Sequence, residues 1–383
     1  MAENGARRIR LGMVGGGTGA FIGYVHRIAS RLDGDYELVA GAFSSRPEVS
    51  KQSGKNFGIE PTRVYGSYEE MAKAEAVRPD GIEAVSIVTP NHVHFGPAKV
   101  FLEAGIHVIC DKPLTSTLAD ARALAAIKPK NGAKFLLTHN YTGYPLMRQA
   151  RELVKSGALG KIRVVQVEYA QDWLSTPADP GNKQAAWRTD PKKSGAGGAI
   201  GDIGTHAYNI ARFVTGLKTE AVSADLQSFV KGRKVDDNVH ILLRFQGGAR
   251  GMLWASQVAP GNENALKLRV YGEKAGIEWS QENPNQMWFS ELGKPKVLLT
   301  RGGAISQPPA ASMNVRIPGG HPEGYLEAFA TLYSQFAEVI RGTGKAYVPL
   351  LPSLADGVEG IEFITASIAS SKNDGKWTRF SDV

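Results

Sequence analysis

The chain has 383 residues, a single cysteine and a formal net charge of +8, and 42% of its residues are hydrophobic. This length is sufficient for two domains with separate cores. One cysteine excludes an internal disulfide and any zinc site with several cysteine ligands. No apolar run reaches the roughly 20 residues that span a bilayer, and no apolar signal segment follows the N-terminal arginines. We therefore expect a cytoplasmic protein with no membrane partner.

The basic residues are spread along the chain and form no polybasic run. A run of that kind is the usual mark of a nucleic-acid-binding arm, so we expect no nucleic-acid partner. A modest positive field also suits an anionic dinucleotide.

The first part of the chain alternates apolar strands with helical patterns. This alternation predicts a parallel, doubly wound sheet, that is, an α/β fold with an N-terminal Rossmann domain over residues 1–140. The predicted strands are 9–14, 37–43, 84–89, 107–110 and 134–138, and the predicted helices are 20–32, 47–57, 68–76, 97–104 and 118–127.

The pattern changes after about residue 157, and residues 141–383 are expected to form a second α/β domain with a largely antiparallel open sheet. Gly247 and Gly248 read as a hairpin turn between two of its strands. A helix beginning near Gly198 is expected to cover one face of the sheet. Two late helices can pack back on either domain, and residues 302–318 are expected to be a loop. The clearest strands are 161–169, 239–245, 251–257, 266–271 and 276–280, and the late helices are 325–341 and 353–370.

The first predicted strand runs into the sequence GMVGGGTGA at residues 12–20. Gly15, Gly17 and Ala20 fit the G-x-G-x-x-G/A fingerprint, in which glycines let the backbone approach a pyrophosphate at a helix N-terminus. Thr18 and Phe21 lie in the same turn and are candidate contacts. A glycine-rich turn without a ligand is the alternative, but the strand before it and the helix after it favour a dinucleotide.

The second predicted strand ends in Ser44, Ser45 and Arg46. NAD enzymes usually have an acidic residue here, which binds the ribose 2′-hydroxyl. Two hydroxyls and an arginine are able to accept a 2′-phosphate, or they form a solvated turn. The sequence leaves NAD and NADP both open.

Residues 198–206 read GAIGDIGTH and continue into a helical pattern. Asp202 and His206 are four residues apart, so they are expected to share a helix face. Lys112 follows an apolar strand, at the edge where open α/β sheets bind ligands. Together these groups can bind a diol, accept a hydroxyl proton and polarise the remaining oxygen. The alternatives are a core histidine, an acid favoured by the helix dipole and a surface lysine.

The order of four motifs identifies a resemblance. The chain resembles the glucose–fructose oxidoreductase / inositol dehydrogenase (Gfo/Idh/MocA) family over essentially its whole length, and is most similar to scyllo-inositol, L-glucose and levoglucosan dehydrogenases. The family implies a Rossmann domain, a C-terminal α/β domain and a homo-oligomer. The motifs are GxG at 15–17, TPN at 89–91, DKP at 111–113 and GDIGTH at 201–206, with WRTDP at 187–191.

The resemblance also implies roles for single residues. Lys112, Asp202 and His206 match the catalytic residues of the family, and Asp111 stands where the family more often has glutamate. Residues matching the cofactor pocket are Thr89, Pro90, Asn91, Asp111, Lys112, Trp187 and Arg188.

Other polar residues at strand ends are less specific. His139 and Tyr141 are candidate substrate contacts, and His94 and Asn140 are candidate cofactor contacts. His92, His94 and His139 lack an acid or cysteine that would complete a metal site, so no metal is expected.

The sequence thus predicts an NAD- or NADP-dependent dehydrogenase that oxidises a secondary hydroxyl of a cyclic polyol or monosaccharide, with His206 as general base. The alternatives are an NAD-assisted glycosidase of the same family and a non-catalytic sugar or cofactor sensor.

Overall fold

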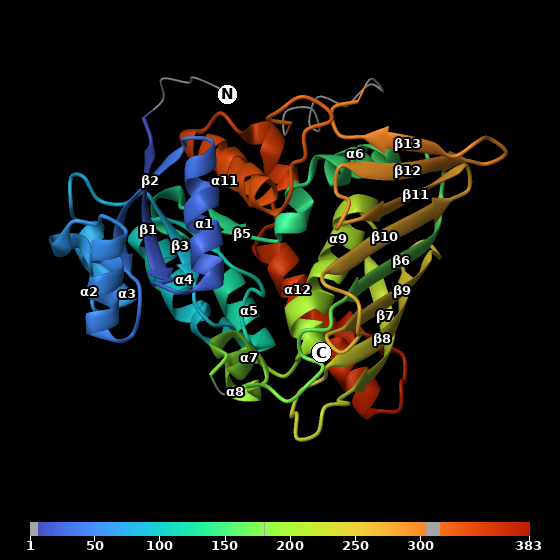
Figure 1. Cartoon of the computed structure of the whole chain (residues 1–383), viewed down its shortest axis with the longest axis horizontal. Helices are drawn as coiled ribbons and strands as arrows, with labels where there is room; N and C mark the ends of the chain where they lie inside the picture. Colours follow the sequence, from blue (N-terminus) through green and yellow to red (C-terminus); the bar gives the residue numbers. More distant parts are fainter. Residues whose placement is uncertain (1–6, 180, 304–314) are drawn as a thin grey trace. The chain divides into compact units, whose positions relative to one another are not determined.

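The computed structural model describes residues 7–179, 181–303 and 315–383. The chain forms two compact units (Figure 1). The first comprises Met1–Asn140 and Tyr325–Val358, and the second comprises Tyr141–Gly324 and Glu359–Val383.

The first unit contains a five-stranded parallel sheet with the strand order β2-β1-β3-β4-β5. The predicted Rossmann fold is confirmed. Every residue of the central strand β3 is buried, as expected for a parallel sheet that is covered on both faces. The strands are β1 (Ile9–Gly15), β2 (Tyr36–Ala42), β3 (Ala84–Val88), β4 (His107–Cys110) and β5 (Phe135–Leu137).

Helices cover this sheet. One of them, α11, comes from the late part of the chain and packs on α1. Phe329, Leu332, Tyr333 and Phe336 of α11 join apolar side chains of β1, β2, β3 and α1 in one buried cluster. The helices are α1 (Phe21–Leu32), α2 (Pro47–Asn56), α3 (Tyr68–Glu75), α4 (Phe95–Ala104), α5 (Leu118–Ala125), α11 (Tyr325–Arg341) and the start of α12 (Leu354–Lys372).

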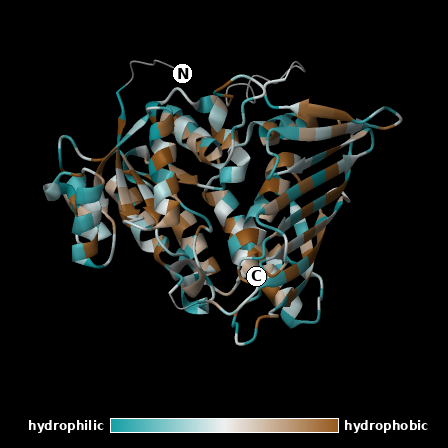
Figure 2. Ribbon diagram, viewed as in Figure 1, coloured by the Kyte–Doolittle hydropathy of each residue, from teal (hydrophilic) through white to brown (hydrophobic). Residues whose placement is uncertain are grey.

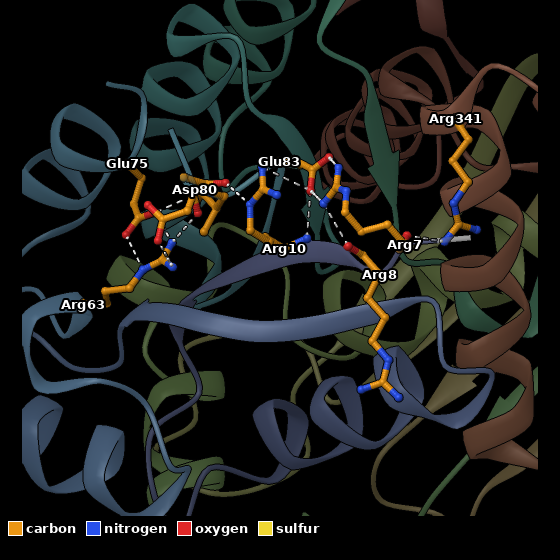
Figure 3. Close-up of polar contacts among 10 residues, drawn as sticks. Arg7, Arg8, Arg10, Arg63, Glu75, Asp80, Glu83 and Arg341 are labelled. Atoms are coloured by element: carbon orange, nitrogen blue, oxygen red, sulfur yellow. Dashed lines mark hydrogen bonds and ion pairs between the residues drawn. The ribbon is translucent and has the colours of Figure 1, made fainter. Parts of the chain in front are cut away.

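A network of ion pairs and hydrogen bonds connects the start of β1 with the segment before β3 (Figure 3). Glu83 accepts hydrogen bonds from the Arg7 guanidinium at 2.7 Å and from the Arg10 backbone N–H at 3.0 Å. Nearby, Arg63 donates to the buried Glu75 at 3.0 Å. Carboxylates therefore balance these arginines locally.

The second unit contains a nine-stranded sheet with the order β13-β12-β11-β10-β6-β9-β8-β7-β14. Among the described strands of this sheet, only β6 and β9 pair in parallel, so the largely antiparallel sheet predicted from the sequence is confirmed. The strands are β6 (Ile162–Ala170), β7 (Thr219–Gln227), β8 (Asn238–Phe245), β9 (Arg250–Ser256), β10 (Ala265–Gly272), β11 (Ala275–Ser280), β12 (Gln286–Glu291), β13 (Val297–Thr300) and β14 (Thr378–Arg379).

One face of this sheet is apolar and covered by a helix. In β8, Val239, Ile241 and Leu243 are buried, whereas His240 and Leu242 between them are exposed. The alternation of hydrophobic and hydrophilic residues is visible along the strands in Figure 2. Helix α9 (Thr205–Thr215) packs on β6, β9 and β10, as expected from the sequence. The predicted hairpin turn at Gly247 and Gly248 joins β8 to β9.

The segment that carries Asp202 and His206 differs from a regular helix. The sequence predicts one continuous α-helix, but Ile200–Gly204 is π-helical and α9 begins at Thr205. Among the described residues, the other α-helices of this unit are α6 (Pro145–Lys155), α7 (Lys183–Arg188), α8 (Pro191–Ser194) and the rest of α12. Residues 304–314 of the predicted loop 302–318 lie outside the described residues. Among the helices that the structure describes, none combines the length and apolar character needed to cross a membrane.

Candidate active site

The glycine-rich turn after β1 has a backbone conformation that only glycine accommodates. Gly15 has a φ of +79°, and a Cβ there would lie 2.9 Å from the Thr89 side chain and 3.0 Å from the Val88 carbonyl oxygen. A Cβ on Gly17 would lie 2.9 Å from the carbonyl oxygen of Phe43. The predicted fingerprint glycines are therefore required by close backbone approach.

Helix α1 begins directly after this turn, with Ala20 as its N-cap and Phe21 as its first residue. No described side chain caps this N-terminus, and its first turn holds no acidic residue. Gly19 faces open space, because no described heavy atom lies within 4 Å of the position of a Cβ. Backbone amides, the helix dipole and room for a ligand fit a pyrophosphate group.

The turn itself is fixed from α2. The backbone N–H of Thr18 donates to Ser53 Oγ at 3.0 Å, and the hydroxyl of Thr18 accepts from the Asn56 side chain at 3.0 Å. Thr18 thus supports the shape of the glycine-rich turn, and it is exposed.

The residues after β2 form a short polar turn. Ser44 Oγ accepts the backbone N–H of Arg46 at 3.2 Å, and Arg46 is the N-cap of α2. Ser45 and Arg46 are exposed. The turn contains two hydroxyls and a guanidinium, which suits a ribose with or without a 2′-phosphate.

The end of β3 leads into the second predicted motif. The Thr89 hydroxyl is buried and has no hydrogen-bond partner among the described residues, and Asn91 opens a short 3-10 helix after Pro90. His94 was predicted to contact cofactor or substrate, but its ring nitrogens lie 2.8 Å from the Pro113 carbonyl oxygen and 2.9 Å from that of Thr89. His94 therefore joins the loops that follow β3 and β4, and both nitrogens of its buried ring lie at hydrogen-bond distance from backbone oxygens.

Lys112 lies at the carboxyl end of β4, directly after Asp111, and the bond from Lys112 to Pro113 is cis. Asp111 accepts a hydrogen bond from the Thr138 hydroxyl at 2.9 Å, and His26 Nε2 lies 3.7 Å from the same oxygen. Burial acts to raise the pKa of Asp111, but the imidazole of His26 and the charge of Lys112 hold it below its usual value. Asp111 is thus kept as a carboxylate beside the lysine.

His139 and Asn140 follow β5 in the same unit, and both are buried. Burial, together with the charge of Lys112, lowers the pKa of His139 to about 4. His139 is therefore neutral at physiological pH. The backbone N–H of Asn140 donates to the carbonyl of Thr138 at 2.9 Å, which fixes the turn where these side chains begin.

In the second unit, Asp202 is held by two side chains. One of its carboxylate oxygens accepts a hydrogen bond from Arg188 Nε at 3.0 Å and another from Gln257 Nε2 at 2.9 Å. The Arg188 guanidinium lies 4.3 Å from the ring centre of Trp187 and 5.8 Å from that of Trp173. In this structure the predicted cofactor pair Trp187 and Arg188 is therefore linked to the predicted substrate-binding carboxylate.

His206 lies in an aromatic setting and is 8% exposed. The Tyr141 ring packs edge-on against it, with ring centres 4.8 Å apart, and the Tyr169 ring lies 6.3 Å away. Burial raises the pKa of Tyr141, and the charge of Asp202 adds to this effect. The negative charge of Asp202 therefore acts on the Tyr141 ring, which packs against His206.

A chain of polar side chains continues from this cluster. The hydroxyls of Tyr141 and Tyr169 are hydrogen-bonded, and Tyr169 donates to Asn264 Oδ1 at 2.8 Å. Gln171 donates to the same oxygen at 2.7 Å and accepts from Trp173 at 2.9 Å. Such a row of hydroxyl and amide groups is suited to a ligand that carries several hydroxyls.

The predicted site residues therefore fall into two groups, one in each unit. Sequence reasoning missed Gln257, Tyr169 and Asn264. A signal existed for Gln257, because it is the last residue of the strand predicted at 251–257, on the sheet that faces the helix, and it directly follows β9 in the structure. In the described ranges, no group of three histidine, cysteine or acidic side chains is placed to hold a metal ion.

Comparison with known proteins places this geometry in a family. Residues 9–139 match the model of the oxidoreductase family with an NAD-binding Rossmann fold, and residues 147–278 match the GFO/IDH/MocA C-terminal domain. A solved oxidoreductase from Sinorhizobium meliloti is 53% identical over 98% of this chain and 100% of its own, with a TM-score of 0.88. The chain belongs to the Gfo/Idh/MocA family.

The names of two further relatives state a ligand or a substrate of those proteins. An inositol dehydrogenase homolog from Azotobacter vinelandii, solved in complex with NADH and myo-inositol, is 37% identical over 98% of both chains, with a TM-score of 0.90. Levoglucosan dehydrogenase from Pseudarthrobacter phenanthrenivorans is 29% identical over 73% of this chain and 76% of its own. The resemblance to inositol and levoglucosan dehydrogenases is confirmed. The chain is an NAD(P)-dependent oxidoreductase of this family.

Proposed function

We propose that this oxidoreductase oxidises a secondary hydroxyl of a cyclic polyol or monosaccharide to a ketone or lactone. The observation that carries the proposal is the cluster of Asp202, His206 and Tyr141 with the amide and hydroxyl groups around it. A carboxylate and an imidazole among many hydrogen-bonding groups suit a substrate with several adjacent hydroxyls. The relatives named for inositol and levoglucosan support this substrate class.

In this proposal each side chain has one task. His206 accepts the proton of the reacting hydroxyl, because a neutral imidazole is a base near physiological pH. Asp202, fixed by Arg188 and Gln257, accepts a hydrogen bond from a neighbouring hydroxyl and orients the substrate. Lys112 donates a hydrogen bond to the reacting oxygen and stabilises the negative charge that develops there.

Residues of the first unit would hold the dinucleotide. The amides of the Gly15–Ala20 turn and of the start of α1 would bind the pyrophosphate, and Thr89 and Asn91 would line the nicotinamide end. The bound nicotinamide supplies the hydride acceptor. Neutral His139 and ionised Asp111 then frame Lys112 without competing for the substrate proton.

The test is absorbance at 340 nm with NAD and with NADP, against inositols, D- and L-sugars and levoglucosan. The expected result is cofactor reduction with at least one polyol or sugar. His206→Asn and Lys112→Met should each lower kcat by about a hundredfold or more, as for loss of a general acid–base group. Cofactor affinity should change little in His206→Asn, whereas Lys112→Met should also weaken cofactor binding.

Other outcomes would overturn the proposal. Bound cofactor with a flat panel, together with sugar release from glycosides and no net reduction, would identify an NAD-assisted glycosidase. Cofactor and sugar binding without turnover of any kind would identify a sensor. Near wild-type turnover in His206→Asn would remove the general-base role.

A further inference from the structure

Asp236 binds three consecutive backbone amides at the start of the helical segment that carries Asp202 and His206. Its two carboxylate oxygens accept the N–H groups of Gly198 at 2.7 Å and Ile200 at 2.8 Å. Its backbone carbonyl accepts the N–H of Ala199 at 2.9 Å. Asp236 comes from the loop between β7 and β8, so one residue of a distant loop caps this helix from outside.

The fit between the two segments is close. A Cβ on Gly198 would lie 2.1 Å from the backbone oxygen of Asp236 and 2.7 Å from the Val235 side chain. Only glycine at 198 allows this approach. The contact therefore needs both residues: Gly198 leaves the space and Asp236 supplies the oxygens.

The capped segment has an irregular backbone. Ile200–Gly204 is π-helical, and Asp202 lies in the middle of it, four residues before His206. The first amides of a helix have no partner inside the helix, and π-helical turns are uncommon and concentrate at functional sites. External bonds at the start of this segment therefore fix the turn from which both side chains project.

We propose that Asp236 is a positioning residue, whose carboxylate clamps the amides of Gly198 and Ile200 and thereby sets the position of Asp202 and His206. The inference rests on the proposed function, since it assigns those two residues to the reaction. Arg188 and Gln257 hold the Asp202 side chain, and Asp236 holds the backbone at residues 198–200, just before it.

The clamp requires the ionised form of Asp236. A carboxylate can accept both amide N–H groups, whereas a protonated carboxyl or an amide side chain offers one good acceptor oxygen. Burial raises the pKa of Asp236 to about 6, although the backbone N–H groups of Ile200 and Gly198 lower it. Among the described ionisable groups, the neighbouring Asp237 also raises the pKa of Asp236, and Asp237 is itself paired with Arg233 at 3.4 Å.

Asp237 offers a matched control. It is also buried and also accepts two backbone amides, those of Phe229 and Val230, each at 2.9 Å. Those amides belong to the loop between β7 and β8 and not to the catalytic segment. Asp236→Asn and Asp237→Asn thus make the same chemical change at adjacent buried positions and loosen different segments.

The first experiment compares steady-state kinetics of wild type, Asp236→Asn and Asp237→Asn between pH 5 and 8.5. At pH 8, Asp236→Asn should lower kcat by about tenfold or more, in line with the cost of small misplacements in a site, and cofactor affinity should not change. The ratio of wild-type kcat to Asp236→Asn kcat should fall toward one below pH 6, because protonation of Asp236 loosens the clamp in wild type as the substitution does in the variant. Equal losses in both variants, or a ratio independent of pH, would overturn the proposal.

A second measurement does not depend on turnover. Amide hydrogen exchange of the peptide covering residues 196–207, corrected for the intrinsic pH dependence, should lose protection in wild type as pH falls through about 6. Asp236→Asn should show the unprotected level at every pH. If the wild-type protein oxidises no polyol, the proposed function fails while this measurement still decides the clamp. Unchanged protection in wild type across pH 6 would refute it even if Asp236→Asn does not fold.

Discussion

His26 Nε2 lies 3.7 Å from Asp111 Oδ1, and Asp111 directly precedes Lys112. The other ring nitrogen of His26 is hydrogen-bonded to Tyr333 Oη at 2.8 Å and to Ser86 Oγ at 3.1 Å. His26 is fully buried. A side chain of α1 thus connects α11 and β3 to the carboxylate beside the predicted catalytic lysine.

Removal of this imidazole should therefore destabilise the first unit. In His26→Ala, Asp111 loses the imidazole beside it, and the buried hydroxyls of Tyr333 and Ser86 lose a hydrogen-bond partner. The free energy of unfolding should fall by about 2–4 kcal/mol, the combined effect of a cavity and of unsatisfied buried groups. Urea unfolding at pH 7.5 measures this change.

Tyr333→Phe is the control for the hydroxyl alone, and it should cost about 1 kcal/mol. A loss in His26→Ala no greater than in Tyr333→Phe would show that the imidazole contributes nothing through Asp111.

The raised pKa of Asp236 also predicts how stability depends on pH. A carboxyl whose pKa is higher in the folded state than in the unfolded state makes the folded state bind more protons between those values. The destabilising contribution of the ionised group is fully present above pH 6 and decreases as pH falls below 6. Relative to Asp236→Asn, the free energy of unfolding of wild type should rise by about 1.4 kcal/mol when the pH falls from 7.5 to 5, because pH 5 lies one unit below the folded pKa of about 6.

Urea unfolding of both proteins at the two pH values gives the difference. The remaining titrating groups are the same in both proteins, so their contributions cancel. A difference in unfolding free energy that does not change between the two pH values would show that Asp236 has an ordinary pKa in the folded protein.

The turn after β2 predicts how cofactor preference can be changed. Ser44 Oγ accepts the Arg46 backbone N–H, and an aspartate at this position can accept the same bond. Ser44→Asp should place a carboxylate near the ribose hydroxyls and repel a 2′-phosphate. The ratio of kcat/KM for NAD to that for NADP should rise by about tenfold or more, since hydrogen bonds to charged groups contribute about 1.5–3 kcal/mol.

Ser45→Asp is the control, because Ser45 is exposed and its side chain makes no hydrogen bond that the structure records among the described residues. An equal change in both variants would indicate a general effect of negative charge near the cofactor, and not recognition at Ser44.

The links from Asp202 to Arg188 and Gln257 predict a functional effect that is not a folding defect. Asp202→Asn removes the charge while keeping the shape. It should raise KM for the polyol and lower kcat, so that kcat/KM falls by about a hundredfold, or about 2.7 kcal/mol. The change in unfolding free energy should stay within about 1 kcal/mol.

Stopped-flow fluorescence of cofactor binding together with urea unfolding separates these effects. A large loss of stability with unchanged KM would mean that Asp202 serves the helix and not the substrate.

The sequence was informative wherever a residue acts within its own segment. Gly15 and Gly17 predict the turn, and the alternation of strands and helices predicts the parallel sheet. Lys112 can be placed at a strand end because an apolar strand directly precedes it. These inferences depend on local backbone geometry, which local sequence controls.

Prediction failed where partners are distant or where the backbone is irregular. Nothing in GAIGDIGTH distinguishes a π-helical turn from an α-helical one, and the carboxylate that binds the Ile200 amide comes from a loop 36 residues later. Gln257 and Tyr169 come from separate strands, and their convergence depends on sheet register. His94 is a polar residue in a plausible position, but its bonds to two carbonyls require the fold to be known.

The contribution of α11 to the first unit has a consequence for synthesis of the chain. The five strands of the nucleotide-binding sheet are complete by residue 137, but the helix that covers part of their apolar surface begins at Tyr325. Domains generally fold as they emerge from the ribosome, the N-terminal one first. Here the sheet is not covered until strands β6 to β13 of the second sheet have been translated, and buried positions of α1 and β1 are exposed meanwhile. A fragment ending at residue 140 would carry every nucleotide-binding motif of the first unit and still be prone to aggregate.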